Sequence, residues 1–163
     1  MKSFSFLTSM KIIDLKVEPH HIPVLAGWHH EEWSYLNPKW SAEQRENEMR
    51  LHLTDDLVPS TFVALEERLL GSAAIVEQDM DTKPDLSPWL ASVFVSPESR
   101  GKGVGSKLVL QVMEKAKEAG IPVLYLFTPD KEGFYQKLGW HTISRETYRG
   151  HLVTIMEVSL IGK

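Results

Sequence analysis

Residues 88–128 hold the pattern that most limits the folds open to this chain: an apolar strand, an amphipathic helix and a second apolar strand. Between about Gly103 and Ala119, apolar residues recur at the spacing of one buried helical face, which predicts a helix. The flanking runs PWLASVFVS (88–96) and PVLYLFT (122–128) are short and apolar, as buried strands are. A strand–helix–strand unit of this length forms a right-handed crossover, so the two strands should be parallel. The chain is therefore predicted to be an α/β protein.

The rest of the chain adds further helices and strands that favour antiparallel pairing. Apolar runs, several of them alternating, predict strands at 10–17, 59–67, 69–80, 141–148 and 151–159. Helical spacing and boundary residues predict helices at 18–36, 41–53 and 130–139. Ser41 and Gln44 form a capping-box pattern at the start of the second helix, and Pro23 falls in the first turn of the first. We therefore expect a mixed sheet with antiparallel neighbours at 59–67, 69–80 and 88–96.

Size and composition limit the class of protein. The length of 163 residues fits one domain, which we expect to span 10–163 after a lead-in segment, 1–9. The net charge of -4 argues against nucleic acid as a partner, and the absence of cysteine excludes disulfides and thiolate chemistry. No apolar run approaches the roughly 18 residues of a membrane span, and no secretory signal begins the chain. We therefore expect a cytoplasmic protein that does not bind membranes.

The junction between the strand at 88–96 and the following helix carries three alternating glycines, Gly101, Gly103 and Gly105. Backbone N–H groups exposed there, beside the positive end of the helix dipole, would bind an anion. The run GKGVGSK lacks the GK[ST] that a P-loop places after a four-residue spacer. The dinucleotide pattern GxGxxG fails at Ser106, and the next strand ends without the carboxylate that such a site needs. Neither common nucleotide loop fits.

The spacing that does fit is RGKGVG, residues 100–105, which matches [RQ]-x-x-G-x-[GA]. It resembles the pyrophosphate loop of the GNAT superfamily of N-acetyltransferases. The preceding run PWLASVFVSPES resembles the central strand of that family, and FYQKLGW (134–140) resembles a second family segment. The order of elements fits from about residue 10 to residue 160. The segment DMDTKPDLSPWLASVFV further resembles a bacterial subgroup whose substrate is unassigned.

The resemblance implies the GNAT fold: a mixed, mostly antiparallel sheet with one parallel, splayed pair of strands and about four helices. It implies acetyl-CoA as co-substrate and no metal. The central strand is expected to bind acetyl-CoA through backbone groups, including a bulge N–H that polarises the thioester carbonyl, at Ser92, Val93, Phe94 and Val95. The glycine loop is expected to bind the phosphates through Arg100, Gly101, Lys102, Gly103, Val104, Gly105 and Ser106.

Catalytic residues follow from the same resemblance and from local charge. The resemblance points to Tyr135 as the acid that protonates the leaving thiolate; the alternative is that Tyr135 is only a core residue. Glu77 and Asp79 would share one face of an extended strand, so either could relay a proton from an ammonium substrate. Residues 77–85 have a local charge of about -3, which favours a cationic acceptor near Asp81. The alternative is a solvated hairpin end.

The segment GWHHEEWSYLNPKW (27–40) would line the acceptor pocket in this family. Three aromatic residues are candidates for a substrate-binding wall with cation–π character: Trp33, Tyr35 and Trp40. The alternative is that Trp28 and Trp33 are simply core residues. The run His29-His30-Glu31-Glu32 is not HExxH, because position 34 is serine, so we expect no metal there.

We therefore expect an acetyl-CoA-dependent N-acetyltransferase whose acceptor is the primary amine of a small, cationic molecule. Two alternatives stay open. One is an acyltransferase that uses a longer acyl group or acts on a protein or peptide N-terminus, and the other is a non-catalytic CoA-binding sensor. The strand-forming ends SFSF and VTIMEVSL leave room for a homodimer.

Overall fold

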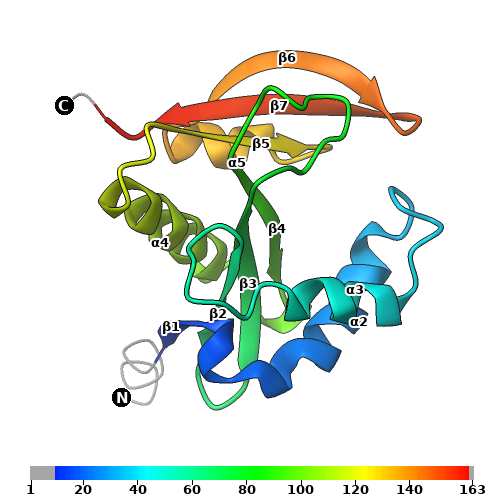
Figure 1. The fold of residues 1–163 in the computed structure, drawn as a ribbon, viewed down its shortest axis with the longest axis vertical. Coiled ribbons are helices and arrows are strands. Elements are labelled where there is room, and N and C mark those ends of the chain that lie inside the picture. The colour runs from blue at the N-terminus through cyan, green and yellow to red at the C-terminus, as the bar shows by residue number, and fades with distance from the viewer. Residues whose placement is uncertain (1–9, 162–163) are drawn as a thin grey trace.

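The computed structural model describes residues 10–161, and within this range seven strands form one sheet in the order β1-β2-β3-β4-β5-β7-β6 (Figure 1). The strands are β1 (Lys11–Asp14), β2 (Ser60–Leu65), β3 (Leu69–Val76), β4 (Trp89–Val95), β5 (Val123–Thr128), β6 (His141–Tyr148) and β7 (His151–Ser159). The α-helices are α2 (Ile22–Trp33), α3 (Ala42–Arg50), α4 (Val104–Glu118) and α5 (Glu132–Lys137). Short 3-10 turns lie at Leu15–Val17, Pro19–His21 and Pro97–Ser99.

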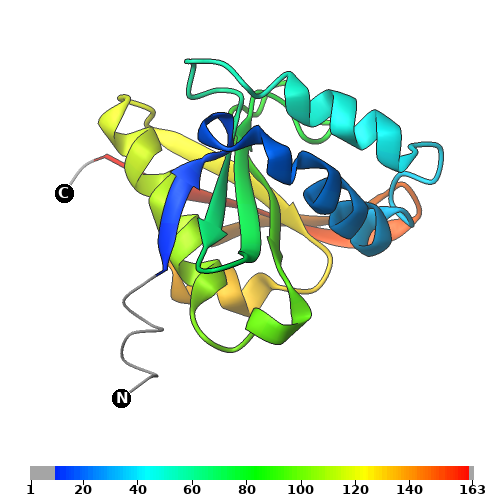
Figure 2. The same cartoon turned by 90° about the horizontal axis from the view of Figure 1, so that it is seen from below.

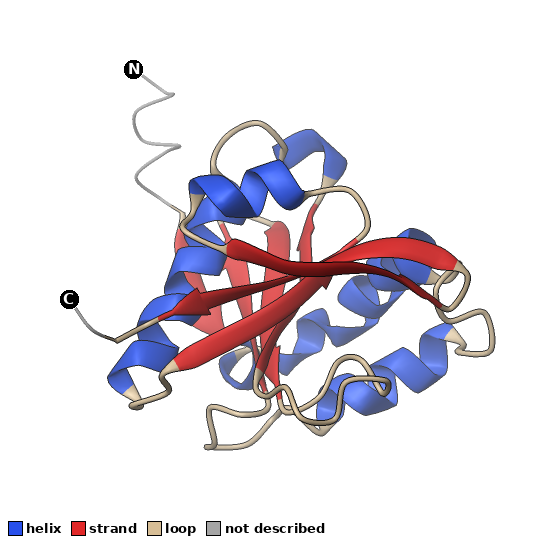
Figure 3. Cartoon of the chain, turned by 90° about the horizontal axis from the view of Figure 1, so that it is seen from above, coloured by secondary structure: helices blue, strands red, loops and turns tan. Residues whose placement is uncertain are grey.

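One pair of strands, β4 and β5, is parallel, and all the other neighbours are antiparallel. The parallel pairing is limited to Trp89 opposite Tyr125, with Tyr125 N–H donating to the Pro88 carbonyl at 3.1 Å. Beyond this contact the sheet divides into two parts, β1–β4 and β5–β7, which diverge (Figures 1 and 3). The expected α/β class, the mixed sheet and the splayed parallel pair are confirmed.

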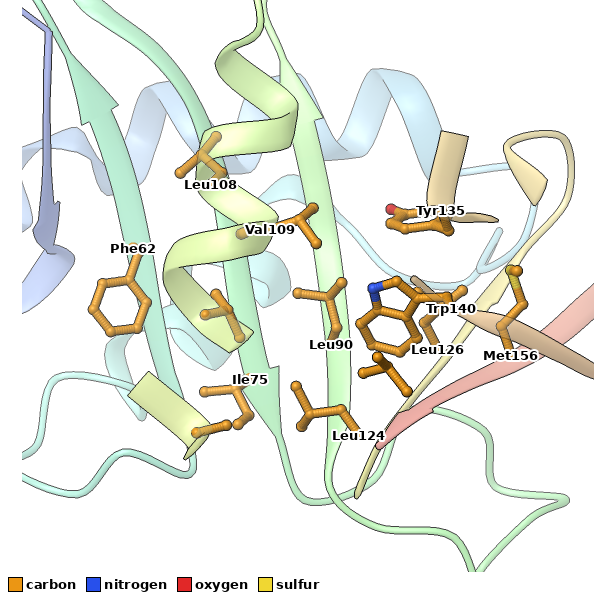
Figure 4. Close-up of a cluster of buried hydrophobic side chains, with 14 of the residues drawn as sticks. Phe62, Ile75, Leu90, Leu108, Val109, Leu124, Leu126, Tyr135, Trp140 and Met156 are labelled. Carbon is orange, nitrogen blue, oxygen red and sulfur yellow. The ribbon is translucent and has the colours of Figure 1, made fainter. Parts of the chain in front are cut away.

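Alternate residues of β2 place the helices on opposite faces of the β1–β4 part. Phe62 and Ala64 pack in the cluster that contains α4, whose buried stripe includes Leu108 and Val112 (Figure 4). Val63, on the other face of β2, packs in a second cluster that takes in the apolar residues of α2 and α3. Figure 2 shows α4 and the α2–α3 pair on either side of these strands.

Two predicted strands are shorter than expected. The run at 10–17 stops at Asp14, because the Asp14 carboxylate accepts from Lys16 N–H at 2.8 Å and caps a 3-10 turn. The run at 69–80 stops at Val76, so that residues 77–88 form a long loop that reaches across to the β6–β7 hairpin (Figure 1).

The predicted helices are present, although the first is shorter than the expected 18–36. The capping box of α3 is formed, with Ser41 and Gln44 bonded to each other's backbone at 2.8 and 3.1 Å. The first helix begins at Ile22, after a 3-10 turn, and ends at Trp33. The predicted lead-in 1–9, with its SFSF strand, lies outside the described residues. Among residues 10–161, no helix has the length and apolar character needed to cross a lipid bilayer.

Candidate active site

A cleft of about 620 Å³ opens where β4 and β5 diverge. Its walls come from β4, β5, α5, the α2–α3 segment and the loop after β3. Because these elements meet only in the folded chain, the cleft brings together residues predicted separately from the sequence. The predicted residues that line it are Trp33, Trp40, Glu77, Asp79, Asp81, Ser92, Val93 and Tyr135.

The strand β4 is bulged at the cleft. Ser72 pairs with Phe94 and Ala74 with Ala91, so β4 carries one more residue than β3 across this interval. Ser92 has a φ of 55°, an unusual conformation for a residue with a side chain. The bulge turns the backbone of Ser92 and Val93 out of the regular ladder and into the lining of the cleft.

Two consecutive hydrogen bonds, from His29 to Ser72 and from Ser72 to Ser92, support this bulge. His29 of α2 lies with Nε2 2.9 Å from Ser72 Oγ, and the Ser72 hydroxyl donates to the Ser92 carbonyl at 3.0 Å. Burial, helped by the charge of Arg45, lowers the pKa of His29 to about 3. The imidazole is therefore neutral. Because the Ser72 hydroxyl donates its hydrogen to the Ser92 carbonyl, Nε2–H of His29 is the donor in the bond to Ser72 Oγ.

The glycine loop forms the start of α4. Gly103 is the N-cap residue, with φ of 84°, and no side chain caps the first N–H groups of this helix. A helix start of this kind offers free donors and a positive dipole end to an anion. Arg100, predicted to contact phosphate, has its Nε bonded to the Val95 carbonyl at 2.9 Å, and Lys102 is exposed. None of residues 100–106 lines the 620 Å³ cleft.

Tyr135 of α5 is 7% exposed and packs edge-on against Phe134 and Trp140, with ring centroids 4.9 and 6.1 Å away (Figure 4). Burial, followed by the charge of Asp130, raises the pKa of Tyr135 well above its usual value. The phenol is therefore protonated throughout the physiological range, as an acid must be at the start of a reaction. It belongs both to the core and to the lining of the cleft, so the two readings of Tyr135 are compatible.

The three predicted acids lie in the loop after β3, and not on an extension of that strand. Asp79 is partly buried, and burial raises its pKa to about 7 even though the charge of Arg149 opposes this shift. Asp81 is exposed and pairs with Arg149 at 3.4 Å, while Glu77 is exposed. Asp79 therefore has the proton affinity that a base working near neutral pH requires.

The predicted aromatic wall is partly assembled. Trp33 and Trp40 line the cleft, whereas Tyr35 does not; its ring packs edge-on against His151 at 4.8 Å. His29, one of the histidines excluded as a metal ligand, is bonded to Ser72. Within the described residues, one group with metal-ligand spacing lies before α2, away from the cleft, at Glu18, His20 and His21.

Several residues of the site escaped the sequence analysis. Arg149 lies between the strands expected at 141–148 and 151–159, a position that signals no role, yet it contacts Asp81 and the Leu36 carbonyl, both at 3.4 Å. Arg45 sits on the predicted second helix, and its helical position alone gave no sign that it would be buried beside the cleft. His52 lines the same wall.

Comparisons with known proteins agree with this geometry. The family model described as Acetyltransferase (GNAT) family matches residues 25–140. N-alpha-acetyltransferase 30 of Schizosaccharomyces pombe (strain 972 / ATCC 24843) is 31% identical over 96 residues, which is 56% of this chain and 63% of that protein. The chain thus spans less than two thirds of the length of this relative.

Solved structures share the fold at low sequence identity. The structure of yncA from Salmonella typhimurium, determined with its cofactor acetyl-CoA, has a TM-score of 0.73 at 16% identity, covering 95% of this chain and 96% of that one. Spermidine N-acetyltransferase from Vibrio cholerae, in complex with CoA and spermine, has a TM-score of 0.71 at 16% identity, covering 94% and 96%. With a family model that matches more than half of its length and a fold shared over 95% of the chain, this chain belongs to the acetyltransferase (GNAT) family.

Proposed function

We propose that this protein transfers the acetyl group of acetyl-CoA to the primary amine of a small, cationic molecule by direct attack. The observation that carries the proposal is the content of one cleft. A carboxylate with a pKa of about 7, a protonated phenol and a bulged strand face it together: Asp79, Tyr135 and β4 at Ser92. Amide formation from a thioester needs a base, an acid and a donor to the carbonyl oxygen.

The residues present fit acetyl-CoA. The uncapped start of α4 suits the pyrophosphate, and the divergence of β4 from β5 leaves β4 backbone groups at 93–95 without a strand partner on that side. When bound, acetyl-CoA supplies an acetyl group on a thioester, which an amine can attack. The predicted cofactor residues from Ser92 to Ser106 therefore remain our assignment for its binding.

Each group in the cleft has a defined task in this scheme. Asp79 takes a proton from the acceptor ammonium, directly or through a water molecule, so that a neutral amine can attack. The Val93 N–H donates to the carbonyl oxygen as negative charge develops there. Tyr135 gives its proton to the departing sulfur and is reprotonated as the attacking nitrogen loses one, so the protons balance.

The acceptor class follows from the rim of the cleft. Three carboxylates and two tryptophans favour an ammonium group: Glu77, Asp79, Asp81, Trp33 and Trp40. The Vibrio cholerae neighbour binds spermine, which supports an amine acceptor, whereas the Schizosaccharomyces pombe relative is named for N-alpha-acetylation, which favours a peptide N-terminus as second candidate. The homodimer and the cytoplasmic location remain predictions.

A screen for thioester consumption separates these candidates. The protein is incubated with acetyl-CoA and polyamines, aminoglycosides, amino acids or N-terminal peptides, and free thiol is measured alongside calorimetric binding of acetyl-CoA. We expect tight binding and turnover with small amines. Turnover with peptides alone would favour the second candidate, acetylation of a peptide N-terminus. Binding without turnover over the whole panel would contradict an enzyme and favour the CoA-binding sensor.

A further inference from the structure

We propose that the acceptor carries a carboxylate in addition to its amine, and that Arg45 of α3 binds this carboxylate in the wall of the cleft. The proposal rests on the proposed function and specifies its acceptor: the ammonium group stays the cationic end, and a carboxylate forms the other end. The acids of the loop after β3 would attract the ammonium end, and Arg45 would bind the other end.

Arg45 is a buried cation for which the described residues supply no counter-ion. Its side chain lines the cleft and is 9% exposed, and neither Nε nor Nη2, both fully buried, has a hydrogen-bond partner. Glu32 and Glu48 also line the cleft, but in the described part of the chain neither forms an ion pair with Arg45. Burial lowers the pKa of Arg45, and no carboxylate opposes this effect. An uncompensated buried charge is unfavourable, and an anionic ligand would compensate it.

The neighbours of Arg45 cannot replace an anion. Trp40 lies with its ring centroid 5.9 Å from Cζ, at the outer limit of a cation–π contact. His52 is bonded to Thr61 through Nδ1 at 2.9 Å, and burial lowers its pKa, so it is neutral at physiological pH. His29 is neutral as well.

The phosphates of the cofactor are not the missing anion. They are assigned to the start of α4, and none of residues 100–106 lines the cleft that contains Arg45. Arg149, the other arginine of the cleft, already contacts Asp81 and the Leu36 carbonyl and is exposed. An anion at Arg45 must therefore belong to the acceptor.

The chemistry of the unpaired atoms favours a carboxylate. A guanidinium presents parallel N–H bonds along one edge, and the two oxygens of a carboxylate match them. Trp40, 39% exposed, has its ring centroid 5.9 Å from the guanidinium carbon, so an anion bound at Arg45 would change the surroundings of this indole ring. Tryptophan fluorescence should therefore report binding without any turnover.

The test uses linear ω-amino acids of two to six carbons and α-amino acids, each compared with its own carboxamide. We expect the best free acid to have a KM roughly 10- to 100-fold lower than its amide, the range of a hydrogen-bonded ion pair. Arg45→Met should raise the KM of the free acids to that of their amides and abolish the fluorescence change. The control is Arg50→Met, which removes an exposed arginine of the same helix that pairs with Glu46 at 3.3 Å.

Stability gives an independent readout, because Arg45→Met removes a buried, unpaired charge. We expect its melting temperature to equal or exceed that of the parent protein, and free acids to raise the melting temperature of the parent only. If the amides have KM values as low as the acids at every chain length, and turnover is intact, the carboxylate proposal is wrong but the proposed enzymatic function is not contradicted. Acid-selective binding without any turnover would support the carboxylate site and contradict the proposed enzymatic function.

We also propose that His29 and Ser72 position the backbone donor of the reaction. The Ser92 carbonyl and the Val93 N–H belong to one planar, trans peptide group and point in opposite directions. The Ser72 hydroxyl fixes the carbonyl at 3.0 Å on the side of β3, and His29 fixes the hydroxyl at 2.9 Å. The Val93 N–H is thereby directed away from β3 and towards the cleft, which Ser92 and Val93 both line.

The matched variants are Ser72→Ala and Thr61→Val. Each removes a buried hydroxyl that is bonded to a histidine at 2.9 Å, but Thr61 lies on β2 and does not reach β4. We expect Ser72→Ala to lower kcat about 10-fold, part of the effect of losing a backbone donor, with little change in either KM. Thr61→Val should lose stability without this loss of kcat.

The histidine is tested in the same way. His29→Leu should match Ser72→Ala in kcat, the double variant should be no worse than either, and His29→Gln, which keeps an N–H donor, should recover most of the activity. Full kcat in Ser72→Ala, or an equal loss in Thr61→Val, would contradict the positioning role.

Discussion

Replacing Tyr135 with phenylalanine is expected to lower kcat by at least 100-fold and to leave the KM for acetyl-CoA unchanged. The hydroxyl is the one group removed, and general acid catalysis contributes about 10²–10⁴ in rate. The ring remains to pack against Phe134 and Trp140, so the melting temperature should change little. Steady-state kinetics with the best amine from the screen, together with a melting curve, measure both effects.

The raised pKa of Tyr135 shapes how this proton moves. A free tyrosinate is costly in the buried site, so we expect the proton to reach sulfur only as the carbon–sulfur bond breaks. The rate should therefore show a solvent isotope effect that disappears in Tyr135→Phe. Tyr125→Phe on β5 is the control, since Tyr125 packs against Trp89 and does not line the cleft. An unchanged kcat in Tyr135→Phe would exclude the acid role.

The parts of the fold that were predictable are those governed by local spacing. The stripe of α4, the capping box at Ser41 and the last hairpin were each found within a few residues of their true bounds. The end of β3 was misplaced because the strand expected at 69–80 was continued through Glu77, Gln78 and Asp79, three consecutive polar residues without alternation, and a loop forms there.

The site was predictable only where a motif recorded it. Tyr135 and the glycine loop stand in short segments with characteristic spacing, so they could be found without the fold. Arg45, His29 and Ser72 stand in separate segments of the sequence. The roles of His29 and Ser72 depend on which faces of α2 and β3 meet the bulge of β4, and that of Arg45 on which face of α3 meets the cleft. No local pattern in a single sequence shows which residues of separate helices and strands will come into contact.

The base can be identified by its pH dependence. With Asp79 at a pKa of about 7, kcat/KM should fall about tenfold per pH unit below pH 7, and Asp79→Asn should lower kcat/KM about 100-fold at pH 8 and lose this acidic limb. Glu77→Gln tests the other candidate, and Asp85→Asn, an exposed acid of the same loop outside the cleft lining, is the control. An acidic limb that survives in Asp79→Asn would assign the base elsewhere.

The substitution Asp79→Asn should lower activity but raise the stability of the folded protein. The pKa of Asp79 is raised from 3.8 in the unfolded chain to about 7 in the folded one, so the folded state binds the proton more tightly. The contribution of this group to stability is complete below about pH 4 and is lost as pH rises through 7. Asp79→Asn should therefore stabilise the protein above pH 7, measured by denaturant unfolding, while it removes activity. A carboxylate kept only for structure would give a less stable variant, so a gain in stability joined to a loss of turnover would mark Asp79 as retained for its chemistry.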